Sequence, residues 1–256
     1  MVFETNFFKI YYEKYGNNKK SIIILPGWGN TRNTFYPIIE ELKEKYSIYI
    51  LDYPGFGNSP IPSQSLTIYD YAEGIKEWLK ENGIHNPHII AHSFGGRITA
   101  LLIGKLKVKV DKVLLIDVAG IKRRKKLKIF IKEIIYKILK KITYLFPTIK
   151  QEELRQKLLL FFSSSDYQNI PNSMRYTFQN IIKVNLKQYY KRINNDTLIL
   201  WGDKDLDTPL KDAYLLKKII KNSELIVYPN TTHYSYLLNQ TLTIQICKKL
   251  FQKKSN

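Results

Sequence analysis

The chain has 256 residues, 44% of them hydrophobic, which suffices for one sizeable α/β domain. Its net charge is +19, and its single cysteine, Cys247, excludes an intramolecular disulfide and fits a reducing compartment. No apolar run approaches the ~18 residues that a membrane span needs, and no basic region precedes an apolar core at the N-terminus, so we expect a cytoplasmic protein without a signal peptide.

Short apolar segments alternate with segments of helical periodicity along most of the chain. The pattern predicts helices at 34–45, 68–82 and 97–106, and strands at 7–15, 21–25, 46–51, 88–91 and 113–117, with two more beginning at 197 and 223. Such alternation favours a doubly wound, mostly parallel sheet with helices on both faces. Ligand sites in these sheets lie beyond the carboxyl ends of the strands.

The alternation stops between residues 117 and 197. Residues 121–190 have the periodicity of helices: a basic amphipathic one to about 143, a second near 151–162 and a third near 173–190. We therefore predict an α/β core made of residues 1–120 and 191–256. Residues 121–190 would form a helical cap inserted between two strands, as the roof of a substrate pocket.

The turn at residues 89–96 has the composition expected around a nucleophilic serine. The apolar segment Ile89–Ala91 is followed by His92, Ser93, Phe94 and two glycines, before the next helical pattern. Small neighbours allow a sharp turn that holds Ser93 in a strained conformation, with its hydroxyl clear of the sheet. The helix that follows directs free N–H groups and its positive dipole end at an oxyanion formed nearby. The same pattern also fits a tight βα turn without a catalytic role. The distinction depends on whether the chain also offers a base and an acid for Ser93.

Candidate partners follow the last two predicted strands. The apolar segment at 197–201 leads into Gly202 and an acidic turn that ends at Asp205, and the strand from Ser223 leads to a short loop ending at His233. Serine needs an adjacent base at neutral pH, and we expect His233 to be that base. The other histidines are expected to be structural or to point away from the serine: His85, His88 and His92.

Together these segments resemble the α/β-hydrolase superfamily, in its serine-nucleophile branch with a helical cap. Ser93, Asp205 and His233 follow one another in the chain order of its catalytic triad, and the resemblance extends over about residues 7–251. It is carried by five landmarks: Pro26-Gly-Trp-Gly29, Asp52-Tyr-Pro-Gly-Phe-Gly-Asn-Ser59, the Ser93 turn, Gly202-Asp-Lys-Asp205 and His233-Tyr234.

The resemblance implies a role for each triad residue. Ser93 would be the nucleophile, His233 the base that takes its proton, and Asp205 the acid that orients His233. Asp205 is preferred because it lies three residues past Gly202, where family members carry the acid. Asp117, after an earlier strand, is an alternative position for the acid in the superfamily. Close rivals on the same turn are Asp203 and Asp207.

The oxyanion hole implied by the resemblance consists of the backbone N–H groups of Trp28 and Phe94. The Trp28 side chain would line the acyl pocket or belong to the core. Two positions depart from the family pattern: Ala91 replaces the first glycine of Gly-x-Ser-x-Gly, and Pro26-Gly27 replaces the usual His-Gly. Neither change argues against activity, because alanine is small enough for the turn and the expected donors are backbone groups.

A serine nucleophile excludes the aspartate-dependent dehalogenase and epoxide-hydrolase reactions of this fold. We expect a serine hydrolase that cleaves carboxylic esters or thioesters of small to medium acyl substrates through an acyl-enzyme. The alternatives are a carbon–carbon bond hydrolase with the same triad and a non-catalytic binding protein on this fold. The resemblance implies no metal and no organic cofactor.

Nearly half of the net charge lies in the first helix of the predicted cap. Residues 122–141 hold ten basic side chains and one acid, Glu133. The simpler interpretation of this charge is a solvated helix in a lysine-rich protein. The alternative is a basic face that attracts an anionic lipid surface or an acidic acyl carrier. No recognition motif supports a nucleic-acid partner. The basic residues are Lys122, Arg123, Arg124, Lys125, Lys126, Lys128, Lys132, Lys137, Lys140 and Lys141.

Overall fold

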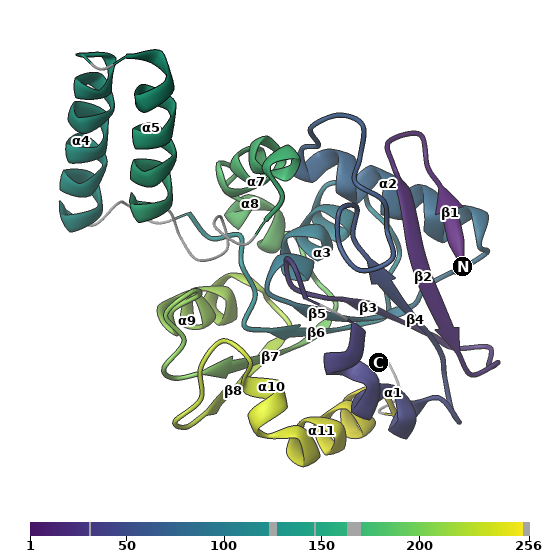
Figure 1. The fold of residues 1–256 in the computed structure, drawn as a ribbon. Coiled ribbons are helices and arrows are strands. Elements are labelled where there is room, and N and C mark those ends of the chain that lie inside the picture. Colours follow the sequence, from purple (N-terminus) through teal and green to yellow (C-terminus); the bar gives the residue numbers. More distant parts are fainter. Residues whose placement is uncertain (31, 123–126, 146, 163–169, 253–256) are drawn as a thin grey trace. The chain divides into compact units, whose positions relative to one another are not determined.

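The computed structural model describes residues 1–30, 32–122, 127–145, 147–162 and 170–252 (Figure 1). It divides into two compact units. The first contains residues 1–122 and 176–256, and the second contains residues 123–175. The first unit holds the sheet and all the predicted site residues.

An eight-stranded sheet forms the centre of the first unit, in the order β1-β2-β4-β3-β5-β6-β7-β8. Strand β1 pairs antiparallel with β2, and β2 pairs antiparallel with β4. The other six strands, in the order β4-β3-β5-β6-β7-β8, run parallel to one another. The predicted doubly wound, mostly parallel sheet is therefore confirmed. The strands are β1 Val2–Glu4, β2 Lys9–Tyr15, β3 Ser21–Leu25, β4 Ser47–Asp52, β5 His88–His92, β6 Lys112–Ile116, β7 Asp196–Gly202 and β8 Ser223–Tyr228.

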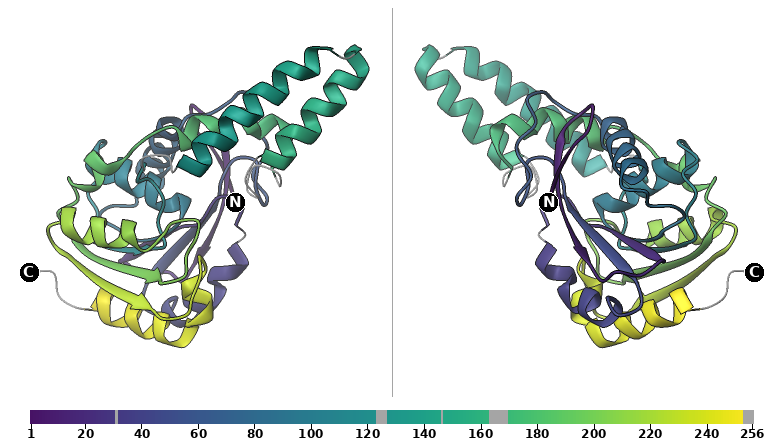
Figure 2. Two further views of the ribbon diagram at one scale, coloured as in Figure 1. Left: turned by 90° about the vertical axis from the view of Figure 1, so that its left-hand side faces the viewer. Right: turned by 90° about the vertical axis from the view of Figure 1, so that its right-hand side faces the viewer.

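The central strands β4, β5 and β6 are buried along their whole length because helices cover both faces of the sheet. Alternate residues of β5 and β6 enter two different cores: Ile89 and Val113 belong to one, and Ile90 and Leu114 to the other. The first core is closed by α2 (Ile68–Glu81), α3 (Phe94–Gly104), α8 (Lys187–Tyr190) and α9 (Lys211–Ile219). The second core is closed by α1 (Tyr36–Leu42), α10 (Ser235–Leu238) and α11 (Gln240–Gln252) (Figures 1 and 2). Cys247 is buried in the second core as a packing residue.

Helices α1, α2 and α3 overlap the helical segments predicted at 34–45, 68–82 and 97–106. Helix α2 starts at a capping box: the Thr67 hydroxyl oxygen accepts from Asp70 N–H at 3.3 Å, and the Asp70 carboxylate accepts from Thr67 N–H at 2.7 Å. The helices are α1 Tyr36–Leu42, α2 Ile68–Glu81, α3 Phe94–Gly104, α7 Arg175–Ile182, α8 Lys187–Tyr190, α9 Lys211–Ile219, α10 Ser235–Leu238 and α11 Gln240–Gln252.

The helix predicted near 173–190 is two helices, α7 and α8. Arg97 explains the interruption, because its guanidinium donates to the carbonyl oxygens of Ile181 and Val184, both at 3.2 Å. Leu186 N–H then donates to Gly120 O at 2.8 Å, which fixes the connecting segment against the core. The cap range predicted from the sequence, 121–190, thus includes residues 176–190, which belong to the first unit.

The second unit contains α4, Leu127–Ile142, and α5, Thr148–Phe162, which pack against each other. The exposed part of α4 combines isoleucines, among them Ile138, with Lys137, Lys140 and Lys141. The basic residues Arg123–Lys126 lie outside the described residues. Across the part of the chain that is described, no helix has both the length and the apolar character needed to cross a membrane.

Candidate active site

Ser93 lies on a strained turn between β5 and α3. Its φ and ψ angles are 47° and −108°, which place a non-glycine residue in the left-handed half of conformational space. Such a conformation costs on the order of 1–3 kcal/mol and persists where the surrounding structure imposes it. Gly95 is required in this turn, because a Cβ there would overlap the carbonyl oxygen of Leu25. The turn lifts the serine above the carboxyl end of β5.

The His233 ring lies between Ser93 and Asp205, within hydrogen-bonding distance of both. His233 Nε2 is 2.8 Å from Ser93 Oγ, and His233 Nδ1 is 2.8 Å from Asp205 Oδ2. The carboxylate accepts from Nδ1–H, which leaves Nε2 as the acceptor for the serine hydroxyl. The structure therefore brings together three residues that are separated by up to 140 positions in the chain.

Asp205 is held by a set of donors that leaves its carboxylate little freedom. It is 2% exposed, and its Oδ1 accepts from the backbone N–H groups of Asp207 and Thr208 at 2.8 and 2.9 Å. The Thr208 hydroxyl donates to Oδ2 at 2.6 Å. The sequence signal for this partner is local, because a threonine three residues after an aspartate is a common hydrogen-bond partner of the carboxylate.

Asp117, the alternative acid, has different partners. Its Oδ1 accepts from Gly202 N–H at 2.8 Å, and its Oδ2 accepts from the Ser235 hydroxyl at 2.6 Å and the Ser235 N–H at 3.2 Å. Burial raises the pKa of this fully buried carboxyl to about 7. Asp117 thus links the end of β7, three residues before Asp205, to the segment two residues after His233.

The electrostatics favour an ion pair between the imidazole and the carboxylate. Burial alone would lower the pKa of His233, but the hydrogen bond and the charge of Asp205 outweigh it and raise that pKa. Burial alone would raise the pKa of Asp205, but the hydrogen bonds from His233 and Thr208 outweigh it and lower that pKa. These opposite shifts favour an ionised Asp205 and a His233 that holds its proton to higher pH than an ordinary imidazole.

The loop at residues 26–30, called the Trp28 loop below, lies beside the serine turn. Gly95 N–H donates to Pro26 O at 3.0 Å, which fixes this loop against the start of α3. The Trp28 ring packs edge-on against Phe94 and Phe56, with ring centroids 5.1 and 4.8 Å apart. The two residues predicted to supply the oxyanion hole are therefore neighbours, and the Trp28 side chain belongs to an aromatic cluster.

A sequence model of the alpha/beta hydrolase fold matches residues 20–240. The chain belongs to the α/β-hydrolase fold family. Lipase 3 of Moraxella sp. (strain TA144) is 25% identical to it, over 88% of this chain and 75% of the lipase. Lipase 1 of Psychrobacter immobilis is 26% identical, over 88% of this chain and 75% of that lipase. This α/β hydrolase is thus a lipase- or esterase-like enzyme.

Solved structures share the fold of this α/β hydrolase. MGS-M2, an alpha/beta hydrolase from a Medee basin deep-sea metagenome library, has a TM-score of 0.77 at 18% identity, covering 100% of this chain and 98% of that chain. A membrane phospholipase A has a TM-score of 0.75 at 20% identity, covering 98% of this chain and 85% of that chain. At such identities the likeness extends to the architecture alone.

The raised pKa of His233 leads to a prediction about pH. If His233 is the base that accepts the serine proton, it must be neutral, so we expect the hydrolase to be inactive below this pKa and active above it. We expect kcat/KM for an acyl ester to rise with pH along a limb whose midpoint lies above 6.5, the ordinary imidazole value. The measurement is kcat/KM from about pH 5 to about pH 9. A rate that falls across this range would exclude His233 as the base.

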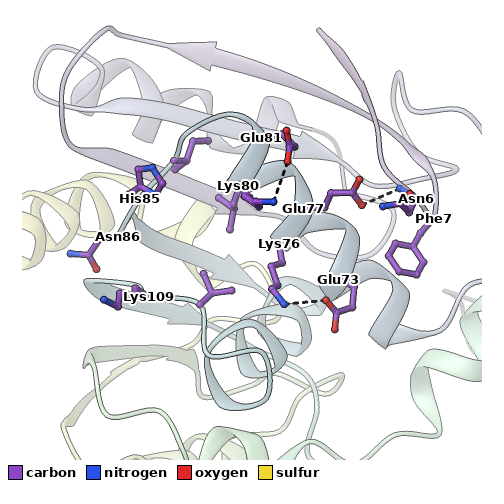
Figure 3. A pocket seen from close by; sticks show the side chains of 13 residues that line it. Asn6, Phe7, Glu73, Lys76, Glu77, Lys80, Glu81, His85, Asn86 and Lys109 are labelled. Carbon is purple, nitrogen blue, oxygen red and sulfur yellow. Dashed lines mark hydrogen bonds and ion pairs between the residues drawn. The ribbon is translucent and has the colours of Figure 1, made fainter.

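The remaining histidines of the hydrolase have structural surroundings. His88 is buried at the start of β5, where it stacks on Phe251 at 4.7 Å, and burial lowers its pKa to about 4. His85 lines a surface hollow with residues of α2 (Figure 3). Two ion pairs along α2 border this hollow, Lys76 with Glu73 and Lys80 with Glu81.

One group of side chains in this hydrolase has the spacing of metal ligands. Asp205, Asp207 and His233 offer ligand atoms within 4.8 Å of one another. Asp205 and His233 already hydrogen-bond each other, and His233 also contacts Ser93. The arrangement is explained by the serine–histidine–aspartate line without an ion, and the absence of a metal requirement stays a prediction.

Proposed function

We propose that this α/β hydrolase cleaves carboxylic esters or thioesters of small to medium acyl substrates, with Ser93, His233 and Asp205 as its catalytic triad. The observation that carries the proposal is the line of two 2.8 Å hydrogen bonds from Asp205 through His233 to Ser93. The positive φ of Ser93 and the lipase relatives support it. Ester hydrolysis needs no group beyond these residues, the oxyanion donors and water.

In the proposed reaction, Ser93 Oγ attacks the carbonyl carbon while its proton passes to His233 Nε2. The carbonyl oxygen becomes an oxyanion that accepts hydrogen bonds from the N–H groups of Trp28 and Phe94. Collapse of the intermediate breaks the bond to the alcohol or thiol, which leaves with the proton held on His233. Water then attacks the acyl-enzyme by the same route and releases the acid and Ser93. Asp205 stabilises the imidazolium in both steps.

The two alternatives differ in what they require of the same residues. A carbon–carbon bond hydrolase uses the same triad and would act on a dienoic diketo acid but not on simple esters. A non-catalytic binding protein would have no use for a strained serine in contact with a buried imidazole–carboxylate pair, so the geometry favours an enzyme.

An activity screen over p-nitrophenyl esters of graded acyl length tests the proposed substrate class. We expect turnover of at least one short or medium acyl ester and of the matching thioester, with Ser93→Ala as the control for background hydrolysis. A dienoic diketo acid belongs in the same screen. Activity on that acid, with no activity on any ester, would assign carbon–carbon bond hydrolysis instead.

An anionic partner at the basic face of α4, either a lipid surface or an acidic acyl carrier, stays a prediction. It rests on the charge of residues 122–141 and on the exposure of Lys137, Lys140 and Lys141. Electrostatic binding of this kind would weaken as ionic strength rises.

A further inference from the structure

His92 is a buried titratable residue that the proposed reaction does not use. It is 0% exposed although it directly precedes the nucleophile, and both of its ring nitrogens have partners. Nε2 lies 2.8 Å from the backbone carbonyl oxygen of His233, and Nδ1 lies 3.2 Å from Nδ2 of Asn30. One ring therefore contacts the loop of the catalytic base and the Trp28 loop at the same time.

These two contacts define the protonation of the His92 ring. A carbonyl oxygen can only accept, so Nε2 must carry the proton, and a neutral ring then presents Nδ1 as an acceptor for the Asn30 amide. The Asn30 amide has a matching orientation, because the Tyr234 hydroxyl donates to its Oδ1 at 2.9 Å. Burial lowers the pKa of His92 to about 3, in agreement with a ring that stays neutral.

These hydrogen bonds form a closed circuit, called the hydrogen-bond ring below, because Tyr234 follows His233 directly in the chain. The hydrogen-bond ring runs from the Tyr234 hydroxyl to the Asn30 side chain, from Asn30 to the His92 imidazole, and from His92 back to the His233 carbonyl. Gly27 borders it: a Cβ there would lie 2.6 Å from Asn30 Nδ2 and 2.9 Å from His92 Nδ1. A side chain at this glycine would force the Asn30–His92 hydrogen bond apart.

We propose that His92 is a positioning residue, whose neutral, Nε2-protonated ring fixes the His233 loop and the Trp28 loop relative to the Ser93 turn. The inference rests on the proposed function, since it concerns the alignment of the base with the nucleophile and the oxyanion donors. Asn30 N–H donates to Gly27 O at 3.2 Å, so the fixed Asn30 also shapes the turn that presents Trp28 N–H. Displacing catalytic groups by about 1 Å can cost about 10²-fold in rate.

The test compares three variants by steady-state kinetics and thermal unfolding. His92→Phe keeps the aromatic packing against Tyr234 and Tyr236 but removes both hydrogen bonds. We expect it to lower kcat by about 10²-fold with little change in KM. His92→Gln retains one donor and one acceptor, so it should recover kcat to within about tenfold of the original chain.

If His92→Phe does not fold, Tyr234→Phe is the second variant. The Tyr234 side chain is 40% exposed, and this change removes only the hydroxyl that orients Asn30. It should lower kcat by about 2- to 10-fold, the effect of one neutral hydrogen bond. A folded His92→Phe with unchanged kcat, or Phe and Gln variants that are equally impaired, would overturn the inference. If Ser93→Ala leaves hydrolysis intact, the proposed function fails instead, and the two failures are thereby distinguished.

Nuclear magnetic resonance of the histidine side chains provides a readout that needs no activity. The chain has four histidines, so ¹⁵N spectra can be assigned by single substitution. We expect His92 to remain a neutral Nε2–H tautomer from about pH 5 to about pH 9. A His92 ring that becomes protonated there, or that carries its proton on Nδ1, would contradict the proposed hydrogen-bond ring.

Discussion

Replacement of Ser93 by alanine is expected to lower kcat/KM for the best acyl ester by about 10³-fold or more, with the melting temperature nearly unchanged. The hydroxyl is the only group at this position that can form the acyl-enzyme, and its removal leaves only the oxyanion donors and substrate binding to assist water. Ester hydrolysis in the purified variant is the measurement. Ser63→Ala, at an exposed serine, is the matched control and should keep the full rate.

The same variant tests whether Ser93 and His233 act as one unit. Because His233 accelerates the reaction by activating Ser93, the double variant Ser93→Ala with His233→Ala should be scarcely slower than Ser93→Ala alone. Losses that add in the double variant would mean that the two side chains act separately, and the assignment of nucleophile and base would be wrong.

The second large effect is expected at the acid. Asp205→Asn should lower kcat by about 10⁴-fold, because an amide at this position favours the wrong imidazole tautomer and does not stabilise the imidazolium. Asp117→Asn is the matched variant on a carboxyl of similar burial. Its side chain bonds Gly202 and Ser235 rather than His233, and asparagine still accepts from Gly202 N–H. We expect this variant to lose at most about tenfold in kcat, since only the support of the two loops is weakened.

Both variants should be measured at the same pH and checked for folding by thermal unfolding. A mild Asp205→Asn together with a severe Asp117→Asn would place the acid after β6, the alternative position that the family resemblance allows. A severe loss in both would show that Asp117 is needed to present the Asp205 and His233 loops together.

The parallel sheet could be predicted from the sequence because its determinants are local. Apolar runs such as Ile22–Leu25 and Val113–Ile116 are short, are bounded by turn residues and alternate with helical periodicity. Once the strands are parallel, their carboxyl ends meet at one edge, so loops distant in sequence converge there. This convergence, together with the resemblance to the α/β-hydrolase superfamily, is why the sequence predicts Ser93, Asp205 and His233 as one site.

The features that could not be predicted from the sequence depend on contacts between residues that are far apart in the chain. His92 could be predicted to point away from Ser93, but its partners are 62 and 141 residues distant, at Asn30 and His233. The interruption between α7 and α8 depends on Arg97, 84 and 87 residues before the two carbonyls that it binds. Periodicity over one window reports on one face of a helix and carries no information about such partners.

Labelling with a fluorophosphonate, followed by mass spectrometry of the peptides, tests the central claim most directly. The reagent phosphonylates a serine that an adjacent base has activated, and it requires no knowledge of the natural substrate. We predict a single adduct on the peptide that contains Ser93, absent in Ser93→Ala and formed much more slowly in His233→Ala. A folded protein that takes up no label, or an adduct on another residue that persists in Ser93→Ala, would contradict the assignment of Ser93 as the nucleophile.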